Sequence, residues 1–292
     1  MSGPRSLLIM PANRADMLAK APKYGADALI FDLEDSVPVA EKPAARALAR
    51  EYIAHHRPAT VIYVRVNALP TGLLEDDLDA VVADGLTGIR LPKAESAEEI
   101  RAVDALIGRL EENRGLEPGA IAISPSLESA RGVWFAHDIL SASPRIRQVT
   151  AGTAEDGDLQ TDLGYSWTAE GEEVLYVRSR ILLAARAAGV EHVLDGSYAN
   201  VRDADGLATC CRAARRLGYR GKSVIHPGQI ETVNRIFTPT PAEVDYYRRV
   251  IATFDAAVER GSAATTVDGK LVDYAMAGMA RRFIAWAEGV GN

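Results

Sequence analysis

The sequence predicts a closed (β/α)8 barrel, the TIM-barrel fold. Eight short apolar runs alternate with longer amphipathic stretches along the chain, which is the pattern of strands joined by crossover helices in a parallel sheet. Eight such units within about 230 residues fit a closed barrel better than an open doubly wound sheet. The first apolar run is also followed by MPANR rather than by the glycine-rich turn of a dinucleotide-binding sheet.

The expected strands are short apolar runs, and the expected helices carry apolar residues at helical spacing. Several of these helices end in a glycine-containing stop, such as RLG at 216–218. The expected strands are Ser6–Met10, Ala28–Leu33, Val61–Asn67, Gly88–Lys93, Ala120–Ser124, Val149–Gly152, His192–Gly196 and Ser223–His226. The expected helices between them are Lys42–His55, Leu73–Asp84, Ala97–Glu112, Gly132–Leu140, Glu172–Ala188 and Gly206–Leu217.

We expect two parts in the chain, a catalytic barrel at residues 1–236 and a C-terminal helical extension at residues 237–292. The extension is expected to contain a helix at Pro241–Arg260, the polar stretch GSAATTVDGK, and a second helix that begins at Tyr274. An appendage of this length after a complete barrel is typical of a lid or an oligomer contact.

Composition and charge exclude several classes of protein. The 292 residues are 48% hydrophobic and 25% charged, as in ordinary globular proteins, and their net charge of −7 argues against a general nucleic-acid-binding surface. The two cysteines, Cys210 and Cys211, are adjacent, and no Cys/His spacing indicates zinc. The start of the chain lacks the apolar run of a signal peptide and no stretch of 18 apolar residues occurs, so we expect a cytoplasmic protein without membrane contact.

Charged or titratable residues follow most of the expected strands. In a barrel of this kind the active site lies where the strands run out into their following loops. Carboxylates crowded together repel one another, and a divalent cation can neutralise them where a few Arg and Lys side chains cannot. Oxygen ligands favour Mg2+ or Mn2+ over zinc, so the sequence predicts a hard-cation site at this end of the barrel. The residues are Asp32, Glu34, Asp35, Arg65, Asn67, Lys93, Glu95, Glu128, Glu155, Asp156, Asp158, Asp195 and His226.

Several of these residues also have a purely structural interpretation. Asp32 and Asp35 could cap a helix or fold a loop, and Lys93 and Glu95 could form an exposed pair. Asp195 precedes a glycine and could be a turn residue, and His226 precedes a proline and could serve only as a hydrogen-bonding group. Arg65 is harder to explain in this way, because a charged residue between Val64 and Val66 must find a partner.

At these positions the chain resembles the citrate lyase β-subunit-like and malyl-CoA lyase proteins of the HpcH/HpaI aldolase–citrate lyase superfamily. The segment PRSLLIMPANRADMLAKAPKYGADALIFDLEDSV matches the opening pattern of that family. The motifs RVN at 65–67, LPKAE at 91–95, PSLESARGV at 125–133, DLQTDLG at 158–164 and GKSVIHPGQI at 221–230 follow in the family's order and spacing. The match covers nearly the whole chain, and the combination is specific although each short motif alone is weak.

The resemblance implies a TIM barrel that holds Mg2+, with Mn2+ as a possible substitute, through Glu128 and Asp158. The segment GTAEDGD is two residues longer than the family pattern, so Asp156 competes with Asp158, which has the matching distance to Gly164.

The resemblance also implies roles for other residues. Arg65 would contact substrate together with Glu128, and Glu34 and Asp35 would anchor metal-bound water or ligand. Arg14 and Lys20 match positions near the phosphate-bearing carrier. Asp273, within DGKLVDYA, matches a residue that closes over the site of a neighbouring subunit, which implies a homo-oligomer such as a trimer or hexamer.

The expected function is a metal-dependent carbon–carbon lyase with Arg65, Glu34 and Asp273 as catalytic residues. Its substrate would be a 3-hydroxyacyl thioester such as malyl-, citramalyl- or citryl-CoA, which it would cleave to acetyl-CoA and a 2-oxo acid, or form from them. Three alternatives remain open at this stage. They are a citrate lyase β subunit acting on an acyl-carrier thioester, an aldolase acting on free 2-oxo acids, and a non-catalytic barrel that binds a metabolite.

Overall fold

The computed structural model describes residues 3–55 and 61–290 of the chain. The chain forms two compact units: Pro4–Ile236 makes up the first, and the second begins at Phe237. Within the described ranges, no helix combines the length and the apolar character needed to cross a lipid bilayer.

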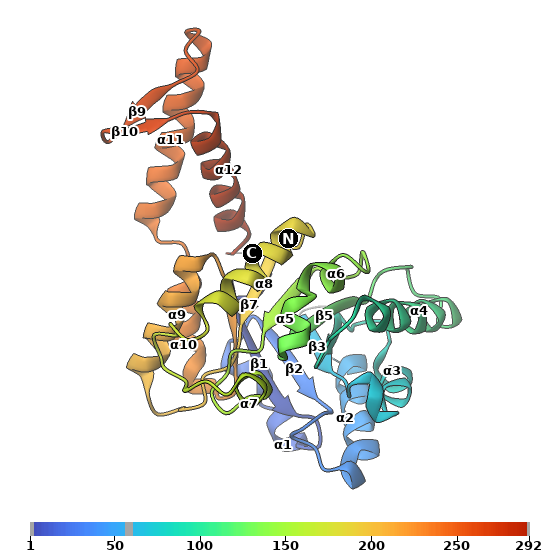
Figure 1. Ribbon diagram of the computed structural model, residues 1–292. Helices are drawn as coiled ribbons and strands as arrows, with labels where there is room; N and C mark the ends of the chain where they lie inside the picture. The colour runs from blue at the N-terminus through green and yellow to red at the C-terminus, as the bar shows by residue number, and fades with distance from the viewer. Residues whose placement is uncertain (1–2, 56–60, 291–292) are drawn as a thin grey trace. The chain divides into compact units, whose positions relative to one another are not determined.

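The first unit is a closed barrel of eight parallel strands that pair in chain order, with β8 returning to pair with β1 (Figure 1). The predicted barrel is therefore confirmed, and each expected strand overlaps an observed one. The strands are β1 (Ser6–Pro11), β2 (Ala28–Asp32), β3 (Val61–Arg65), β4 (Gly88–Leu91), β5 (Ala122–Leu127), β6 (Gln148–Ala151), β7 (His192–Asp195) and β8 (Gly221–Val224).

The interior of the barrel is filled with apolar side chains from several strands. Gly88 on β4 makes room there, because a Cβ atom at this position would lie 2.8 Å from Cε1 of Tyr63 and 2.6 Å from the carbonyl oxygen of Ala122. This packed layer forms a floor beneath the carboxyl ends of the strands. The cluster comprises Leu7, Ala28, Ile30, Tyr63, Ala122 and Leu194, with Ile9 packed against it.

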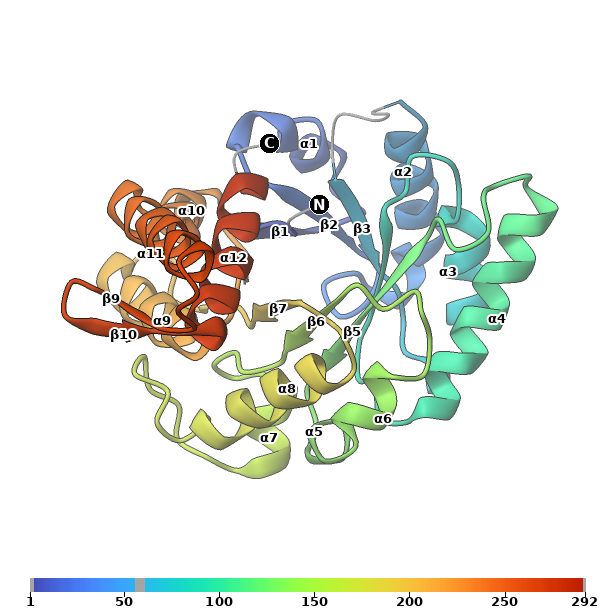
Figure 2. The same cartoon turned by 90° about the horizontal axis from the view of Figure 1, so that it is seen from above.

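Helices surround the barrel, and Figure 2 shows α2, α3, α4, α6 and α8 outside the ring of strands. The single helix expected at 132–140 is observed as two short helices, because the chain bends at Phe135. The first of these helices begins earlier than expected because the Ser129 side chain caps its N-terminus. The α-helices are α1 (Ala15–Leu18), α2 (Lys42–His55), α3 (Leu74–Val81), α4 (Ala97–Asn113), α5 (Ala130–Trp134), α6 (Ala136–Leu140), α7 (Asp158–Leu163), α8 (Leu175–Ala187), α9 (Ala204–Leu217) and α10 (Ile230–Phe237). The 3-10 helices are η1 (Ala21–Tyr24), η2 (Val39–Glu41), η3 (Leu69–Thr71) and η4 (Pro227–Gln229).

The second unit consists mainly of two helices and a hairpin, α11 (Pro241–Glu259), β9 (Thr265–Val267), β10 (Lys270–Val272) and α12 (Tyr274–Gly289). Both C-terminal helices were expected, but the polar stretch between them forms an antiparallel hairpin that the sequence analysis missed. Asp268 and Gly269 both have positive φ, 49° and 76°, which is the conformation that a tight Asp-Gly hairpin turn requires. The core of this unit comprises Val250, Phe254, Val267, Val272, Ala277 and Ala280. Its expected role as a lid stays a prediction.

Candidate active site

Arg65, at the end of β3, is held by two carboxylates that follow β2. Asp32 lies opposite Arg65 in the strand register, and its two oxygens accept hydrogen bonds of 2.7 Å each from Nε and Nη2. Nη1 lies 2.9 Å from Oε2 of Glu34. The partner that the buried guanidinium requires is therefore Asp32. Burial alone would raise the pKa of Asp32, but the hydrogen bonds and charge of Arg65 outweigh it and keep the pKa below its usual value.

Glu34 is an acid whose ionisation the site disfavours. Its side chain is 6% exposed, and burial together with the negative charges of Asp35 and Glu128 raises its pKa to about 7, in spite of the nearby cations. A carboxyl group with a pKa near neutrality can accept and return a proton at physiological pH. This property fits the catalytic role predicted for Glu34.

Lys93 brings the predicted acids together. Its ammonium lies 3.0 Å from Glu34, 3.4 Å from Asp35 and 3.6 Å from Asp158. Its backbone N–H donates a 2.7 Å hydrogen bond to Oε1 of Glu128, and the residue adopts the left-handed conformation with φ of 50°. A non-glycine residue in this conformation is uncommon and often marks a functional loop. Lys93 is thus a central cation of the site.

The expected exposed pair between Lys93 and Glu95 is wrong. The backbone N–H of Glu95 instead donates a hydrogen bond of 2.9 Å to the carboxylate of Glu99.

Glu128 and Asp158 follow the neighbouring strands β5 and β6. The second oxygen of Glu128 accepts a 3.0 Å hydrogen bond from the Ser126 hydroxyl. Gly152 permits the close approach of the two strand ends, since a Cβ atom there would lie 2.2 Å from Cβ of Glu128. Asp158 is the first residue of α7, and its side chain is 51% exposed. Both carboxylates therefore contact Lys93, Glu128 at the backbone N–H and Asp158 at the ammonium, and both line the same cavity.

The donor set fits a Mg2+ ion of the two-carboxylate kind. Among residues 3–55 and 61–290, no group of three or more His, Cys, Asp or Glu side chains is arranged to hold a metal ion. Mg2+ is commonly held by one or two carboxylates while water and substrate oxygens complete its shell. Glu128 and Asp158 would supply two hard oxygen ligands. Asp156 lies nearby, in the left-handed conformation with φ of 55°.

A cavity of about 270 Å3 joins these residues at the carboxyl end of the barrel. We call it the barrel cavity. Its lining includes Arg65 and Glu128, two of the predicted substrate-binding residues, and both Asp156 and Asp158 contribute to it. It also contains a charged residue that the sequence analysis missed, Arg90 on β4. The charged and hydroxyl residues of the lining include Arg65, Arg90, Glu128, Thr150, Asp156 and Asp158.

Asp195 and His226 lie outside this site, so the expected ring of acids is smaller than predicted. Asp195 is fully buried, and its carboxylate is bound by Lys222 at 2.6 Å, Arg178 at 3.1 Å and the Thr153 hydroxyl at 2.9 Å. Leu194 belongs to the barrel interior, so the next side chain points the other way, toward α8 and α9. His226 caps η4 by accepting a hydrogen bond from the Gly228 N–H.

Four other residues with predicted roles are not among those that line the barrel cavity: Glu34, Arg14, Lys20 and Asp273. Glu34 instead contacts two cations of the site, Arg65 and Lys93. Arg14 and Lys20 are exposed after β1, and Arg14 forms an ion pair of 3.2 Å with Asp16. Asp273 is in the second unit, where its carboxylate caps α12 by accepting hydrogen bonds from the N–H groups of Ala275 and Met276. Their roles in substrate binding and catalysis stay predictions.

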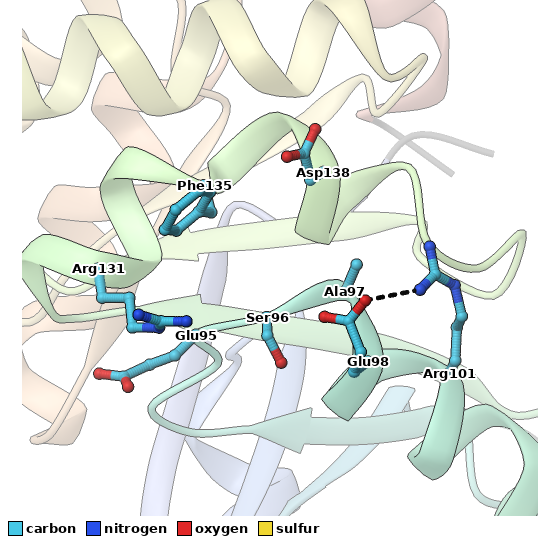
Figure 3. A pocket seen from close by; sticks show the side chains of 8 residues that line it. All are labelled: Glu95, Ser96, Ala97, Glu98, Arg101, Arg131, Phe135 and Asp138. Atoms are coloured by element: carbon cyan, nitrogen blue, oxygen red, sulfur yellow. Dashed lines mark hydrogen bonds and ion pairs between the residues drawn. The ribbon is translucent and has the colours of Figure 1, made fainter.

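A second cavity, of about 290 Å3, lies between the start of α4 and the helices α5 and α6 (Figure 3). Its lining carries both signs of charge: Arg101 pairs with Glu98 at 3.1 Å, and the Arg131 guanidinium lies 5.3 Å from the ring centre of Phe135. Glu95, one of the charged residues expected near the cation site, lines this second cavity instead of the barrel cavity.

Comparison with known proteins places the chain among relatives of matching length. It is 36% identical to the citrate lyase subunit β of Escherichia coli (strain K12), over 97% of this chain and 93% of the relative. It is 35% identical to a (3S)-malyl-CoA thioesterase of Cereibacter sphaeroides (strain ATCC 17029 / ATH 2.4.9), over 98% of this chain and 95% of the relative.

Solved structures with the same fold contain ligands. The protein CitE from Mycobacterium tuberculosis, in complex with magnesium, acetoacetate and coenzyme A, superposes with a TM-score of 0.75 at 31% identity and covers 98% of both chains. A citrate lyase β subunit from the same organism, complexed with oxaloacetate and magnesium, gives a TM-score of 0.66 at 33% identity over 82% of this chain and 98% of that one. The model of the HpcH/HpaI aldolase/citrate lyase family matches residues 5–227, and the chain belongs to that family.

Proposed function

We propose that the protein is a metal-dependent carbon–carbon lyase that cleaves, or forms, a 3-hydroxyacyl thioester. The observation that carries the proposal is that Glu128, Asp158 and the Arg65 side chain line one cavity, with both acids in contact with Lys93. Acids from separate strand ends, a fixed guanidinium and a carboxyl group with a pKa near 7 are the groups that such a cleavage requires.

Glu128 and Asp158 would hold Mg2+, with Mn2+ as a possible substitute. When bound, the ion would supply Lewis-acid polarisation of the oxygens of the 2-oxo acid portion of the substrate. The magnesium in the related M. tuberculosis structures supports this assignment.

The chain's own residues would handle the proton and the developing charge. Glu34 would accept the proton of the 3-hydroxyl group as that oxygen becomes a carbonyl oxygen and the adjacent carbon–carbon bond breaks. The electron pair of that bond passes to the carbon next to the thioester, and Arg65 would stabilise the negative charge that develops on the thioester oxygen. Asp273 of a neighbouring subunit would then protonate the new acetyl carbon.

The acyl carrier is proposed to be coenzyme A. The related CitE structure that contains coenzyme A and covers 98% of this chain supports this choice. Arg14 and Lys20, both exposed after β1, would bind the carrier's phosphate groups. The similarity to a protein named as a citrate lyase subunit supports the alternative of an acyl-carrier protein thioester. An aldolase that acts on free 2-oxo acids would use the same cavity without a carrier. A non-catalytic binding protein would use it without turnover.

Thioester hydrolysis is a second candidate function. It is supported by the 35% identity with proteins named (3S)-malyl-CoA thioesterase. The two reactions differ in the bond that breaks. A lyase leaves the acetyl group on the carrier and releases a 2-oxo acid, whereas a thioesterase releases the carrier thiol and the intact hydroxy acid.

One incubation separates these functions. The purified protein is mixed with Mg2+ and, in turn, malyl-, citramalyl- and citryl-CoA, and the products are resolved by liquid chromatography. Acetyl-CoA together with a 2-oxo acid supports the lyase, and free coenzyme A together with the hydroxy acid supports the thioesterase. Absence of any product, both with coenzyme A esters and with acyl-carrier thioesters, would contradict both functions and favour a binding protein.

A further inference from the structure

Arg90 is a buried guanidinium inside the barrel. It lies on β4 between Arg65 on β3 and Ser124 on β5 in the strand register, and it is 3% exposed. Its Nη1 donates a 2.8 Å hydrogen bond to the hydroxyl of Ser223. Within the described ranges of the chain, its Nε and Nη2 atoms have no hydrogen-bond partner. Most of this group's hydrogen-bonding capacity is therefore unused by the protein.

The charge of Arg90 also lacks a carboxylate partner in the part of the chain that the structure describes. Asp32 is bound to Arg65, and Glu34 is shared between Arg65 and Lys93. The charge of Glu128 also acts on Arg90, but its oxygens accept hydrogen bonds from the Lys93 N–H and the Ser126 hydroxyl. Burial and the positive charge of Arg65 lower the pKa of Arg90 to about 10, so it still carries its charge at neutral pH. A buried charge without a partner is costly and is seldom retained for stability alone.

Arg90 belongs to the lining of the barrel cavity, together with a second residue that carries an unsatisfied group. Thr150 on β6 lines the same cavity, and its buried hydroxyl has no hydrogen-bond partner among the described residues. Neither residue belongs to the predicted metal site, which uses Glu128 and Asp158. A ligand held at that site would therefore still leave a fixed cation and a hydroxyl group facing the cavity.

We propose that Arg90, assisted by Thr150, binds a second carboxylate of the substrate, so that the 2-oxo acid released is a 2-oxo dicarboxylate. This inference rests on the proposed function, which assigns the first carboxylate to the metal end of the cavity. A guanidinium presents parallel N–H groups that match the two oxygens of a carboxylate. A substrate whose oxo acid portion ends in hydrogen or methyl would leave the charge of Arg90 unpaired.

The test compares two ligands that differ at one end only. Oxaloacetate and 2-oxobutyrate share the 2-oxo carboxylate and the chain length, but a methyl group replaces the distal carboxylate in the second. Dissociation constants are measured by calorimetry with saturating Mg2+. The wild-type protein should bind oxaloacetate at least about tenfold more tightly, as expected for charge-assisted hydrogen bonds. Arg90→Met should lose this preference because it binds oxaloacetate more weakly, while its dissociation constant for 2-oxobutyrate should change by less than about twofold.

Matched variants keep the result interpretable. Arg101→Met makes the same substitution at an exposed arginine on α4, and the preference should persist there. Arg90→Lys, which keeps the charge, should retain a smaller preference, and it replaces Arg90→Met if that variant does not fold. Thr150→Val should reduce the preference in the same direction.

The outcomes distinguish this inference from the function on which it rests. Equal binding of the two ligands by the wild-type protein, or a preference unchanged in Arg90→Met and Arg90→Lys, would overturn the role of Arg90. Glu128→Gln should weaken both ligands together, because it removes a metal ligand. If Glu128→Gln binds both ligands normally while Arg90→Met abolishes the preference, the metal site fails and the role of Arg90 stands. Failure of the wild-type protein to bind either ligand would reject both.

Discussion

Arg65 and Asp32 form a bidentate ion pair between the neighbouring strands β3 and β2, with two hydrogen bonds of 2.7 Å. Asp32 is fully buried, and it also accepts hydrogen bonds from the Ser36 hydroxyl and from the backbone N–H groups of Glu34 and Ser36. One carboxylate thus fixes both the guanidinium and the loop that carries Glu34. This arrangement preorganises the charged groups at the mouth of the barrel before any ligand binds.

Asp32→Asn should destabilise the protein and reduce its activity. The substitution keeps the shape of the side chain but leaves the Arg65 charge with Glu34 alone. We expect the free energy of unfolding to fall by about 3 kcal/mol, as for other broken buried ion pairs. Chemical denaturation measures this change. Glu98→Gln, which breaks the exposed pair with Arg101, is the matched control and should change stability by less than about 0.5 kcal/mol. Equal effects of the two substitutions would contradict the assigned role of Asp32.

Glu34→Gln should change the way in which stability depends on pH. The pKa of Glu34 in the folded protein, about 7, lies above the value of 4.5 for an unperturbed glutamate. The unfolded chain therefore releases this proton first, and Glu34 progressively lowers the free energy of unfolding as the pH rises from about 4.5 to about 7.

The Glu34→Gln variant does not lose stability in this way, because glutamine has no proton to release in this pH range. Relative to the wild-type protein, it should gain on the order of 3 kcal/mol between pH 4.5 and pH 8. Thermal unfolding in the presence of EDTA measures the difference without contributions from bound metal. A stability difference that stays constant across this range would show that the carboxyl group titrates normally.

Asp158 and Asp156 can be separated by their effects on metal affinity. Both line the barrel cavity, but only Asp158 is among the carboxylates paired with Lys93 in the described structure. Asp158→Asn should weaken Mn2+ binding, followed by electron paramagnetic resonance, by at least about tenfold because it removes a charged ligand. Asp156→Asn is a suitable control, since asparagine tolerates the left-handed backbone at this position. If Asp156→Asn weakens Mn2+ binding more than Asp158→Asn does, Asp156 and not Asp158 is the second metal ligand.

Asp195→Asn should destabilise the fold, although Asp195 does not line the barrel cavity. The carboxylate is shared by the buried cations Lys222 and Arg178, and together they keep the pKa of Asp195 at about 2, although burial opposes this. Removing its charge leaves both cations uncompensated, at a cost of about 3–5 kcal/mol. Urea denaturation provides the measurement. A loss below about 1 kcal/mol would mean that the two cations find other partners.

The sequence predicted the barrel because it depends on features that repeat along the chain. Eight alternations of apolar and amphipathic segments do not depend on any one residue, and the observed strands follow them. Strand ends were less certain. The strand expected at 120–124 runs from Ala122 to Leu127 in the structure. Its end was predicted too early because the segment SPSL has a polar composition, although all of it is buried.

The site was predicted in part, and the errors have a common cause. Polar residues at the strand ends indicated Arg65, Glu128 and Asp158, which line one cavity in the structure. Arg90 was missed because it stands within β4 rather than after it, although the charged residue between Ile89 and Leu91 gives the same signal as Arg65 between two valines. Asp195 was included wrongly because a shift of one residue along a strand reverses the direction of the side chain. Only the pairing of strands, which one sequence does not reveal, decides that direction.

The most direct test of the account is the metal dependence of Glu128→Gln. The central claim is that Glu128 and Asp158 hold one divalent cation beside Arg65. Initial rates with the preferred 3-hydroxyacyl thioester, measured as a function of Mg2+ concentration, should fall to background in the variant while its thermal unfolding stays close to that of the wild-type protein. Turnover at a wild-type rate, with half-saturation at the same Mg2+ concentration, would contradict the claim.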